Sequence, residues 1–280
     1  MTKWNMVIDV GLCENCNNCF IATKDEHVGN DFPGYSAAEP LHGHRRIDIK
    51  RKVRGSGAMV DAAHMPTMCN HCDDAPCLKI GAGAVTKRAD GIVLIDPVKA
   101  KGRKDIVESC PYGSVWWNEE LQIPQAWTFD AHLLDQGWKM PRGAHACPTG
   151  AMRAFKMSDA ERAEKIKAEG LEELRPELNS RPRVWYKNLH RYTKCFIGGT
   201  VLANIAGKKE CLSGAKVELH RGGKLLGETT SDSFGDFKFD KIDPNSGKYE
   251  VVMSHKQYGQ GRAEANVAVD SVCIGEITLG

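Results

Sequence analysis

The distribution of cysteine constrains this chain more than any other feature of its sequence. Eight of the 11 cysteines come before residue 150, and six of these fall into two tight runs. The first residues lack the long apolar core of a secretion signal, and clustered thiols in such a chain indicate metal binding rather than disulfides. The two runs are Cys13-x2-Cys16-x2-Cys19 and Cys69-x2-Cys72-x4-Cys77.

Each run offers three thiols in one loop, which suits an iron–sulfur cubane better than zinc. A cubane presents one iron corner to each ligand, so three neighbouring thiolates can take three corners and a distant cysteine the fourth. Structural zinc more often takes its ligands as two separated pairs. Cys110 and Cys147 are both followed by proline, which is typical of the fourth ligand in ferredoxin-type runs.

A ferredoxin run has four cysteine positions, spaced x2, x2 and x3, which we call slots. This spacing pairs Cys147 with the first run and Cys110 with the second. The slots that would complete a further cluster beside Cys77 and Cys110 hold Gly81, Ala100, Arg103 and Ile106. The corresponding slots after Cys19 and before Cys147 hold Thr23 and Gly143. Because the fourth cysteine of a run serves the other cluster, the spacing predicts two complete clusters. The ligand sets are Cys13, Cys16, Cys19 and Cys147 for the first [4Fe–4S] cluster, and Cys69, Cys72, Cys77 and Cys110 for the second.

Other interpretations of these residues stay open at this point. Zinc in place of one or both clusters, and cysteines without any metal, are the simplest of them. A third cluster would need unusual ligands, namely Asp130 or one of His27, His132 and His145. The histidines near the runs, His64, His71 and His145, are expected to be hydrogen-bonded or exposed to solvent. Cys195, Cys211 and Cys273 are expected to be ordinary buried thiols, with a Cys211–Cys273 disulfide as the alternative.

The rest of the sequence predicts an α+β chain in three parts. Residues 1–157 contain only short periodic segments, such as Met6–Val10 and Ile92–Ile95, and form the expected ferredoxin-type domain. Residues 158–195 begin with a helix capped by Ser158 and continue as a basic, aromatic linker. Residues 196–280 show short strand patterns separated by glycine-containing turns, which predict a small β-sandwich domain.

Charge and hydropathy exclude several classes of function. The formal net charge is +2, which gives no basis for nucleic-acid binding. No apolar run approaches the ~20 residues of a transmembrane helix. The expected location is therefore the cytoplasm. No nucleophile elbow, phosphate loop or zinc-protease helix is present, so no catalytic residues are predicted in this chain.

Several segments of residues 1–157 resemble the iron–sulfur subunits of molybdopterin oxidoreductases of the dimethyl-sulfoxide-reductase family. The segments are Cys13–Cys19, Cys69–Cys77, Asp90–Pro97, Cys110–Gly113 and Cys147–Gly150. Within that family, the chain looks most similar to the small subunits of pyrogallol–phloroglucinol transhydroxylase and resorcinol hydroxylase. The segments of this second resemblance are Asp25–His27, Phe32–Tyr35, Trp117–Glu120, Ala131–Asp135 and Arg181–Asn188. Through the segments Gly214–Val217 and Phe234–Phe237, the C-terminal region resembles prealbumin-like and carboxypeptidase-regulatory-like β modules.

The resemblance implies a heteromeric enzyme in which this chain is the non-catalytic electron-transfer subunit. The large partner would hold molybdenum or tungsten as bis-molybdopterin guanine dinucleotide and act on hydroxylated aromatics, by hydroxylation or transhydroxylation. Assembly of such heterodimers into larger complexes is a further expectation. The alternatives are the electron-transfer subunit of another molybdopterin oxidoreductase, and a scaffolding subunit whose clusters only hold the fold.

The resemblance also implies that a cluster is missing between the two predicted ones. It places the remaining slots of the last run at Trp127 and Asp130, so that Thr23, Trp127, Asp130 and Gly143 all lack a thiol. Related small subunits are expected to hold three clusters. Direct transfer across the gap would be slow, because tunnelling falls steeply with distance. Three alternatives stay open: the reaction needs no net exit of electrons, the far cluster is structural, or a partner bridges the gap.

Overall fold

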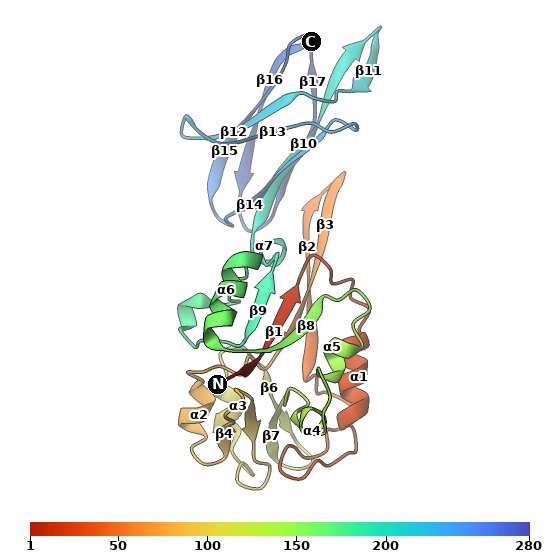
Figure 1. Ribbon diagram of the computed structural model, residues 1–280. Coiled ribbons are helices and arrows are strands. Elements are labelled where there is room, and N and C mark those ends of the chain that lie inside the picture. The colour runs from red at the N-terminus through yellow and green to blue at the C-terminus, as the bar shows by residue number, and fades with distance from the viewer. The chain divides into compact units, whose positions relative to one another are not determined.

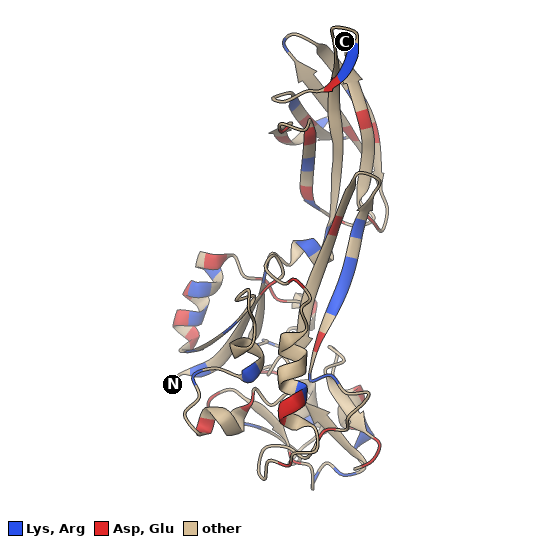
Figure 2. Ribbon diagram, turned by 90° about the vertical axis from the view of Figure 1, so that its right-hand side faces the viewer, with Lys and Arg blue, Asp and Glu red and all other residues tan.

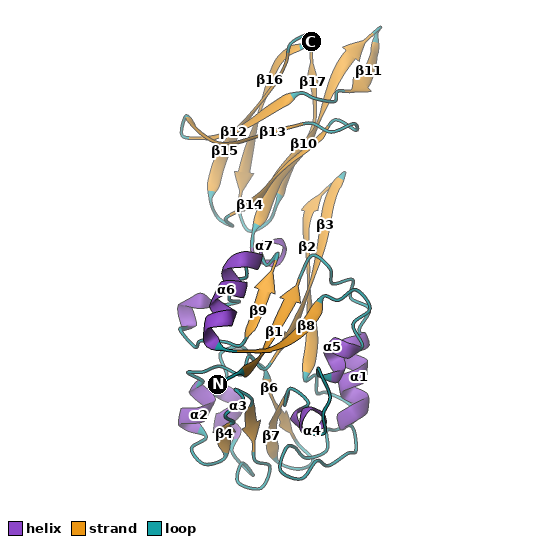
Figure 3. Cartoon of the chain, viewed as in Figure 1, coloured by secondary structure: helices purple, strands orange, loops and turns teal.

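The computed structural model describes residues 1–280, and strands are more numerous than helices (Figure 1, Figure 3). The chain divides into two compact units. Unit 1 comprises Met1–Arg51 and His64–Leu189, and unit 2 comprises Lys52–Ala63 and His190–Gly280. No helix of either unit combines the length and the apolar character that crossing a lipid bilayer requires.

A three-stranded mixed sheet organises unit 1. Its central strand, β1 (Lys3–Asp9), is antiparallel to β8 (Met152–Met157) and parallel to β9 (Val184–Lys187). Residues Trp4 to Asp9 are all buried, as expected for a strand that is covered on both faces. The strand predicted at Met6–Val10 is therefore present and begins earlier, at Lys3.

The two cysteine runs occupy equivalent places beside short helices. The first run follows β1 and enters α1 (Asn18–His27), and the second enters α2 (Pro76–Ile80). Cys110 comes after α3 (Lys104–Glu108), and Cys147 comes after α5 (Arg142–His145). Because α1 contacts α5 and α2 contacts α3, each run lies next to one of the two Cys-Pro segments.

Two hairpins complete unit 1. One joins β4 (Val85–Lys87) to β5 (Val93–Ile95), and the other joins β6 (Val115–Asn118) to β7 (Ile123–Ala126). Their apolar side chains form a small core with Ala100 and Ile106, against which Cys69, Cys77 and Cys110 pack. The short helix α4 (Ala131–Asp135) follows the second hairpin.

The segment after β8 belongs to unit 1. Ser158 caps α6 (Asp159–Glu169) through the predicted capping box, since its hydroxyl accepts from the Glu161 amide and the Glu161 carboxylate accepts from the Ser158 amide. Gly170, in the left-handed conformation, ends the helix. After the short turn η1 (Pro176–Leu178), the chain enters β9.

Unit 2 is a β sandwich of two four-stranded sheets. In one sheet β10 pairs with β11, β14 and β17, and in the other the order is β13-β12-β15-β16. Tyr249, Val251 and Met253 alternate toward the core along β15, as the period of a half-buried strand requires. The strands are β10 (Cys195–Ile205), β11 (Lys208–Cys211), β12 (Lys216–Arg221), β13 (Lys224–Thr230), β14 (Asp236–Ile242), β15 (Gly247–His255), β16 (Gly259–Val267) and β17 (Val272–Leu279).

A long hairpin contributes to both units. It consists of β2 (Ile47–Ser56) and β3 (Met59–Met68), and its outer part, Lys52–Ala63, is assigned to unit 2 together with α7 (His190–Thr193). Basic residues follow closely along β2, where the ribbon of Figure 2 is blue. Within unit 2, Arg54 is fully buried, and its guanidinium donates to the carboxylates of Asp61 and Asp240.

The two compact units differ from the expected three parts in two places. Residues 158–189, expected as a helix and linker, contain β9, which pairs directly with β1. The expected ferredoxin-type range of 1–157 includes the hairpin tip that is assigned to unit 2. Both differences depend on tertiary partners, such as Asp240 for Arg54, that lie far away in the sequence.

Candidate iron–sulfur centres

The first predicted ligand set surrounds one small cavity. Cys13, Cys16, Cys19 and Cys147 all line it, although Cys147 lies more than a hundred residues after the others. The rest of the wall includes the apolar side chains of Ile49, Pro66 and Met152, together with Glu14 and Thr149. The structure therefore brings the four thiols of this set together in unit 1.

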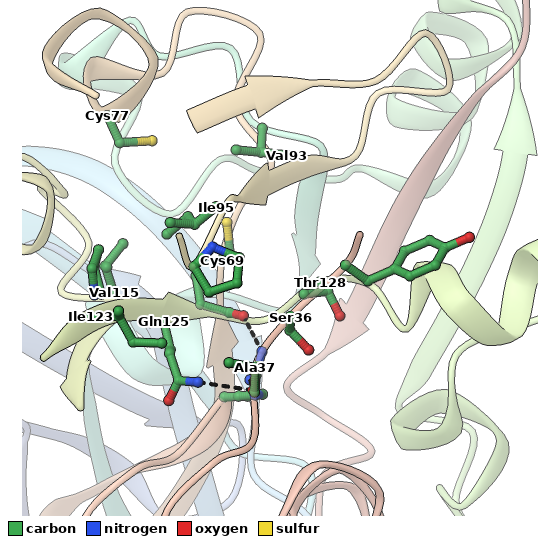
Figure 4. Close-up of a pocket in the computed structure, with 15 residues that line it drawn as sticks. Ser36, Ala37, Cys69, Cys77, Val93, Ile95, Val115, Ile123, Gln125 and Thr128 are labelled. Atoms are coloured by element: carbon green, nitrogen blue, oxygen red, sulfur yellow. Dashed lines mark hydrogen bonds between the residues drawn. The ribbon is translucent and has the colours of Figure 1, made fainter. Parts of the chain in front are cut away.

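The second predicted set gathers at the hairpin core of the same unit. Cys69 and Cys77 line a cavity with Val93 and Ile95, and Figure 4 shows their sulfur atoms near these two side chains. Cys110 packs against the same core. Cys72 is buried. The charges of Cys72 and Cys110 both raise the pKa of Cys69 and Cys77.

Burial makes these thiols poor acids on their own. It raises the pKa of Cys19 to about 12 and that of Cys77 to about 11, and the charges of neighbouring thiols of the same set add to the effect. Four thiolates so close together need a cationic centre to neutralise them. The donor set therefore fits a metal group that all four sulfurs of a set would bind.

Backbone and side-chain donors reach the sulfur atoms. The amides of Asn15 and Phe20 donate in the first set and lower the pKa of the thiols that they contact. In the second set, the Ser114 amide lies 3.5 Å from Cys110 Sγ, and Ser180 hydrogen-bonds to Cys72. Such hydrogen bonds to sulfur tune the reduction potential of an iron–sulfur group.

The geometry of the thiols suits a cubane better than a single ion. No group of three or more His, Cys, Asp or Glu side chains in residues 1–280 is placed to hold one metal ion. All four thiols of the first set and two of the second set, Cys69 and Cys77, line a cavity, and a cubane takes each of its ligands at a separate corner.

The slots without thiols next to the second set are filled by protein. Ala100 and Ile106 are fully buried in the hairpin core, and Arg103 pairs with Asp105. A Cβ atom on Gly81 would lie 2.3 Å from Val85 Cγ2, which leaves no room for a side chain there. Three of the four slots therefore lie in packed apolar surroundings, whereas Arg103 forms an ion pair.

The slots without thiols next to the first set come together in a buried polar region. A Cβ atom on Gly143 would meet Thr23 Oγ1 at 3.3 Å. Asp130 accepts from the Arg142 amide at 2.8 Å and lies 3.3 Å from His27 Nε2. Trp127 is fully buried and stacks on Phe129. The four slots thus lie in one densely packed part of unit 1.

A buried ion pair balances charge in this polar region. Arg46 donates to the Glu39 carboxylate at 2.8 Å and to the Ala126 carbonyl at 2.5 Å. Burial lowers the pKa of His27 despite its contact with Asp130, so the imidazole is neutral near pH 7. Sequence patterns gave no signal for Glu39 or Arg46, because neither residue belongs to a motif.

The histidines near the runs behave largely as expected. Nδ1 of His71 accepts from the Val93 amide at 3.0 Å, and burial lowers the pKa of His71 to about 3, which keeps it neutral. His145 makes an edge contact with Trp138. His132 contacts the Glu26 carboxylate at 2.8 Å.

The three later cysteines are not all buried. Cys195 is buried in the sandwich core, but Cys211 is exposed on β11 and Cys273 is only partly covered. The expectation of a buried thiol was wrong for Cys211, because β11 has no buried residue. All three thiols are free.

Comparison with known proteins adds to this geometry. Residues 60–157 match the family described as 4Fe–4S dicluster domain, and residues 195–275 match the second β-sandwich domain of NOMO1-like subunits of the BOS complex. The small subunit of pyrogallol hydroxytransferase from Pelobacter acidigallici is 44% identical over 284 residues, covering 100% of both chains. This chain belongs to that family of iron–sulfur small subunits. The predicted fold class, a ferredoxin-type domain followed by a β sandwich, is confirmed.

More distant relatives share the cysteine-rich part. The iron–sulfur subunit of arsenate respiratory reductase from Shewanella sp. (strain ANA-3) is 31% identical over 50% of this chain and 55% of the relative. The electron transfer subunit of thiosulfate reductase from Salmonella typhi is 26% identical over 57% of this chain and 79% of the relative. The predicted resemblance is confirmed, and the chain is a non-catalytic, electron-transfer iron–sulfur subunit of an oxidoreductase complex.

Proposed function

We propose that this chain carries two [4Fe–4S] clusters and passes electrons for a large molybdopterin subunit that acts on hydroxylated aromatics. The observation that supports the proposal most strongly is the gathering of eight distant thiols into two sets of four. The first set is Cys13, Cys16, Cys19 and Cys147, and the second is Cys69, Cys72, Cys77 and Cys110.

The role of this chain's residues is to bind and tune these groups. When bound, a cluster supplies one-electron redox chemistry at the centre of each set. The cysteine sulfurs hold it, amides such as that of Asn15 donate to the sulfurs, and apolar walls including Ile49 and Val93 exclude water. Exclusion of water and the number of such donors then set the potential.

The partner and its cofactor rest on the full-length relative. Because the 44% identity extends over both chains completely, the same kind of complex is the best-supported assignment. The large subunit would hold molybdenum or tungsten in bis-molybdopterin guanine dinucleotide and carry all catalytic residues. Assembly of several heterodimers and a cytoplasmic location belong to the same proposal.

A scaffolding role is the second candidate, because the slots at Thr23, Trp127, Asp130 and Gly143 hold no thiol. Rapid freeze-quench electron paramagnetic resonance on the native complex distinguishes the two roles. For a hydroxylation, which releases electrons from the substrate, electron transfer predicts that an aromatic substrate reduces both clusters within one turnover. Clusters that keep their oxidation state throughout turnover would support the scaffold and contradict the proposal.

A further inference from the structure

A buried line of side chains leads away from the first cysteine set along α1. Cys19, Thr23 and His27 follow one another at intervals of four residues, so they share one face of the helix. They are the buried residues of α1, and His27 is completely covered. This face therefore connects a proposed cluster ligand to the interior of unit 1.

The line continues through the segment before α4. His27 Nε2 lies 3.3 Å from Asp130 Oδ1, and both side chains are fully buried. Phe129 precedes Asp130 and stacks on Trp127, with 4.7 Å between the ring centroids and 27° between the ring planes. Two of the slots that lack a thiol are thus occupied by the indole of Trp127 and the carboxylate of Asp130. The Phe129 ring comes between them in the sequence.

The line ends at the second cysteine set. The His71 ring lies 5.4 Å from Trp127 and 5.5 Å from Phe129, measured between centroids. Its Nδ1 atom is 3.9 Å from Cys69 Sγ. His71 is therefore in contact with both the stacked rings and a ligand of the second set.

We infer that this line is the route by which electrons cross between the two clusters. We call it the aromatic relay and define it as His27, Asp130, Phe129, Trp127 and His71. The inference rests on the proposed function. Electronic coupling is stronger through close-packed atoms than through a void. The rings of Trp127, Phe129 and His71 pack on one another, and His27 contacts Asp130, which follows Phe129 in the sequence. The relay residues would couple the two clusters without being oxidised or reduced themselves.

Substitution of the central ring tests the relay in the native complex. Trp127→Leu removes the indole, and Trp127→Phe keeps an aromatic ring at the same place. The rate of electron equilibration between the clusters is measured after photoreduction by one electron, with the two clusters distinguished by their paramagnetic resonance spectra. We expect several-fold slower equilibration in Trp127→Leu, a smaller effect in Trp127→Phe, and unchanged cluster potentials.

Trp185→Leu is the matched control, because Trp185 lies on β9 and not in the relay. If Trp127→Leu does not assemble, Phe129→Leu interrupts the same stack with a smaller change in volume. Equal rates in the wild type and in whichever relay variant assembles, with both clusters present, would overturn the relay. A native complex without two clusters would instead overturn the proposed function, and its iron content shows this before any rate is measured.

Discussion

Units 1 and 2 hold their interiors together in different ways. Unit 2 closes a continuous apolar core between two sheets, and Arg54 is its one buried charged side chain. Unit 1 buries His27, Glu39, Arg46 and Asp130 beside its thiols, and its elements are short. An apolar core stabilises a domain by itself, whereas buried thiols and charges require partners. We therefore expect unit 1 to depend on its clusters for stability and unit 2 to be independent of them.

Loss of one cluster ligand should destabilise unit 1 and leave unit 2 unchanged. This is the largest difference that we expect between the units. Cys72→Ser removes a buried ligand of the second set, so iron should fall from about eight to about four atoms per chain. Hydrogen exchange should then accelerate in the β4–β5 hairpin and remain unchanged in β12 and β15. Cys211→Ser, at an exposed thiol, is the control and should change neither quantity.

Truncation of a side chain in the sandwich core should destabilise unit 2 and leave the iron content of unit 1 unchanged. Leu219→Ala removes a side chain that is 2% exposed, so unit 2 should lose about 2–5 kcal/mol of stability while iron content stays constant. Hydrogen exchange of the β12 and β15 amides measures this loss. Leu226→Ala, at a side chain that is 50% exposed, should cost no more than about 0.5 kcal/mol. Loss of iron from Leu219→Ala would show that the units are not independent.

Acid should reveal a smaller effect within unit 2. Burial opposes ionisation of Asp240, but hydrogen bonds from Arg54, the Lys241 amide and Lys238 lower its pKa to about 2. A carboxylate whose pKa is lowered by folding stabilises the folded state above its ordinary pKa of 3.8, and that stability is lost as the pH falls toward 2.

Asp240→Asn should therefore cost unit 2 roughly 1–2 kcal/mol at pH 7, after allowance for partial exposure, and the cost should shrink below pH 4. Amide protection in β14 as a function of pH is the measurement. Asp243→Asn, whose carboxylate is 70% exposed, is the control. A cost that stays constant from pH 7 to pH 3 would contradict the assigned ionisation.

Local patterns in the sequence were sufficient for much of unit 2 and for α6. In strands such as Tyr249–Met253, the residues that alternate in the sequence also alternate between buried and less buried positions in the sandwich. Ser158 and Glu161 form the predicted capping box of α6. The sequence gives little signal for β11 and β13, because β11 is entirely exposed and β13 is mostly so. Without a buried face, a strand has little hydrophobic periodicity to detect.

The interior of unit 1 could not be predicted in the same way. The spacing of the thiols predicted two sets, and the structure places the members of each set together. The parallel pairing of β9 with β1, and the contacts of Arg183 with Asp73 and Asn5, join residues that are far apart in the sequence. The buried carboxylate of Asp130 likewise contacts the Arg142 amide and His27, and no sequence motif connects these two residues to it.

Elemental mass spectrometry of the native complex, purified without oxygen, tests the two-cluster account most directly. Eight paired thiols predict about eight iron atoms in this chain, no zinc, and molybdenum or tungsten in the large partner. Zinc with little iron would contradict an electron-transfer role. About twelve iron atoms would contradict the two-cluster count, because a third cluster would then occupy the place assigned to the aromatic relay.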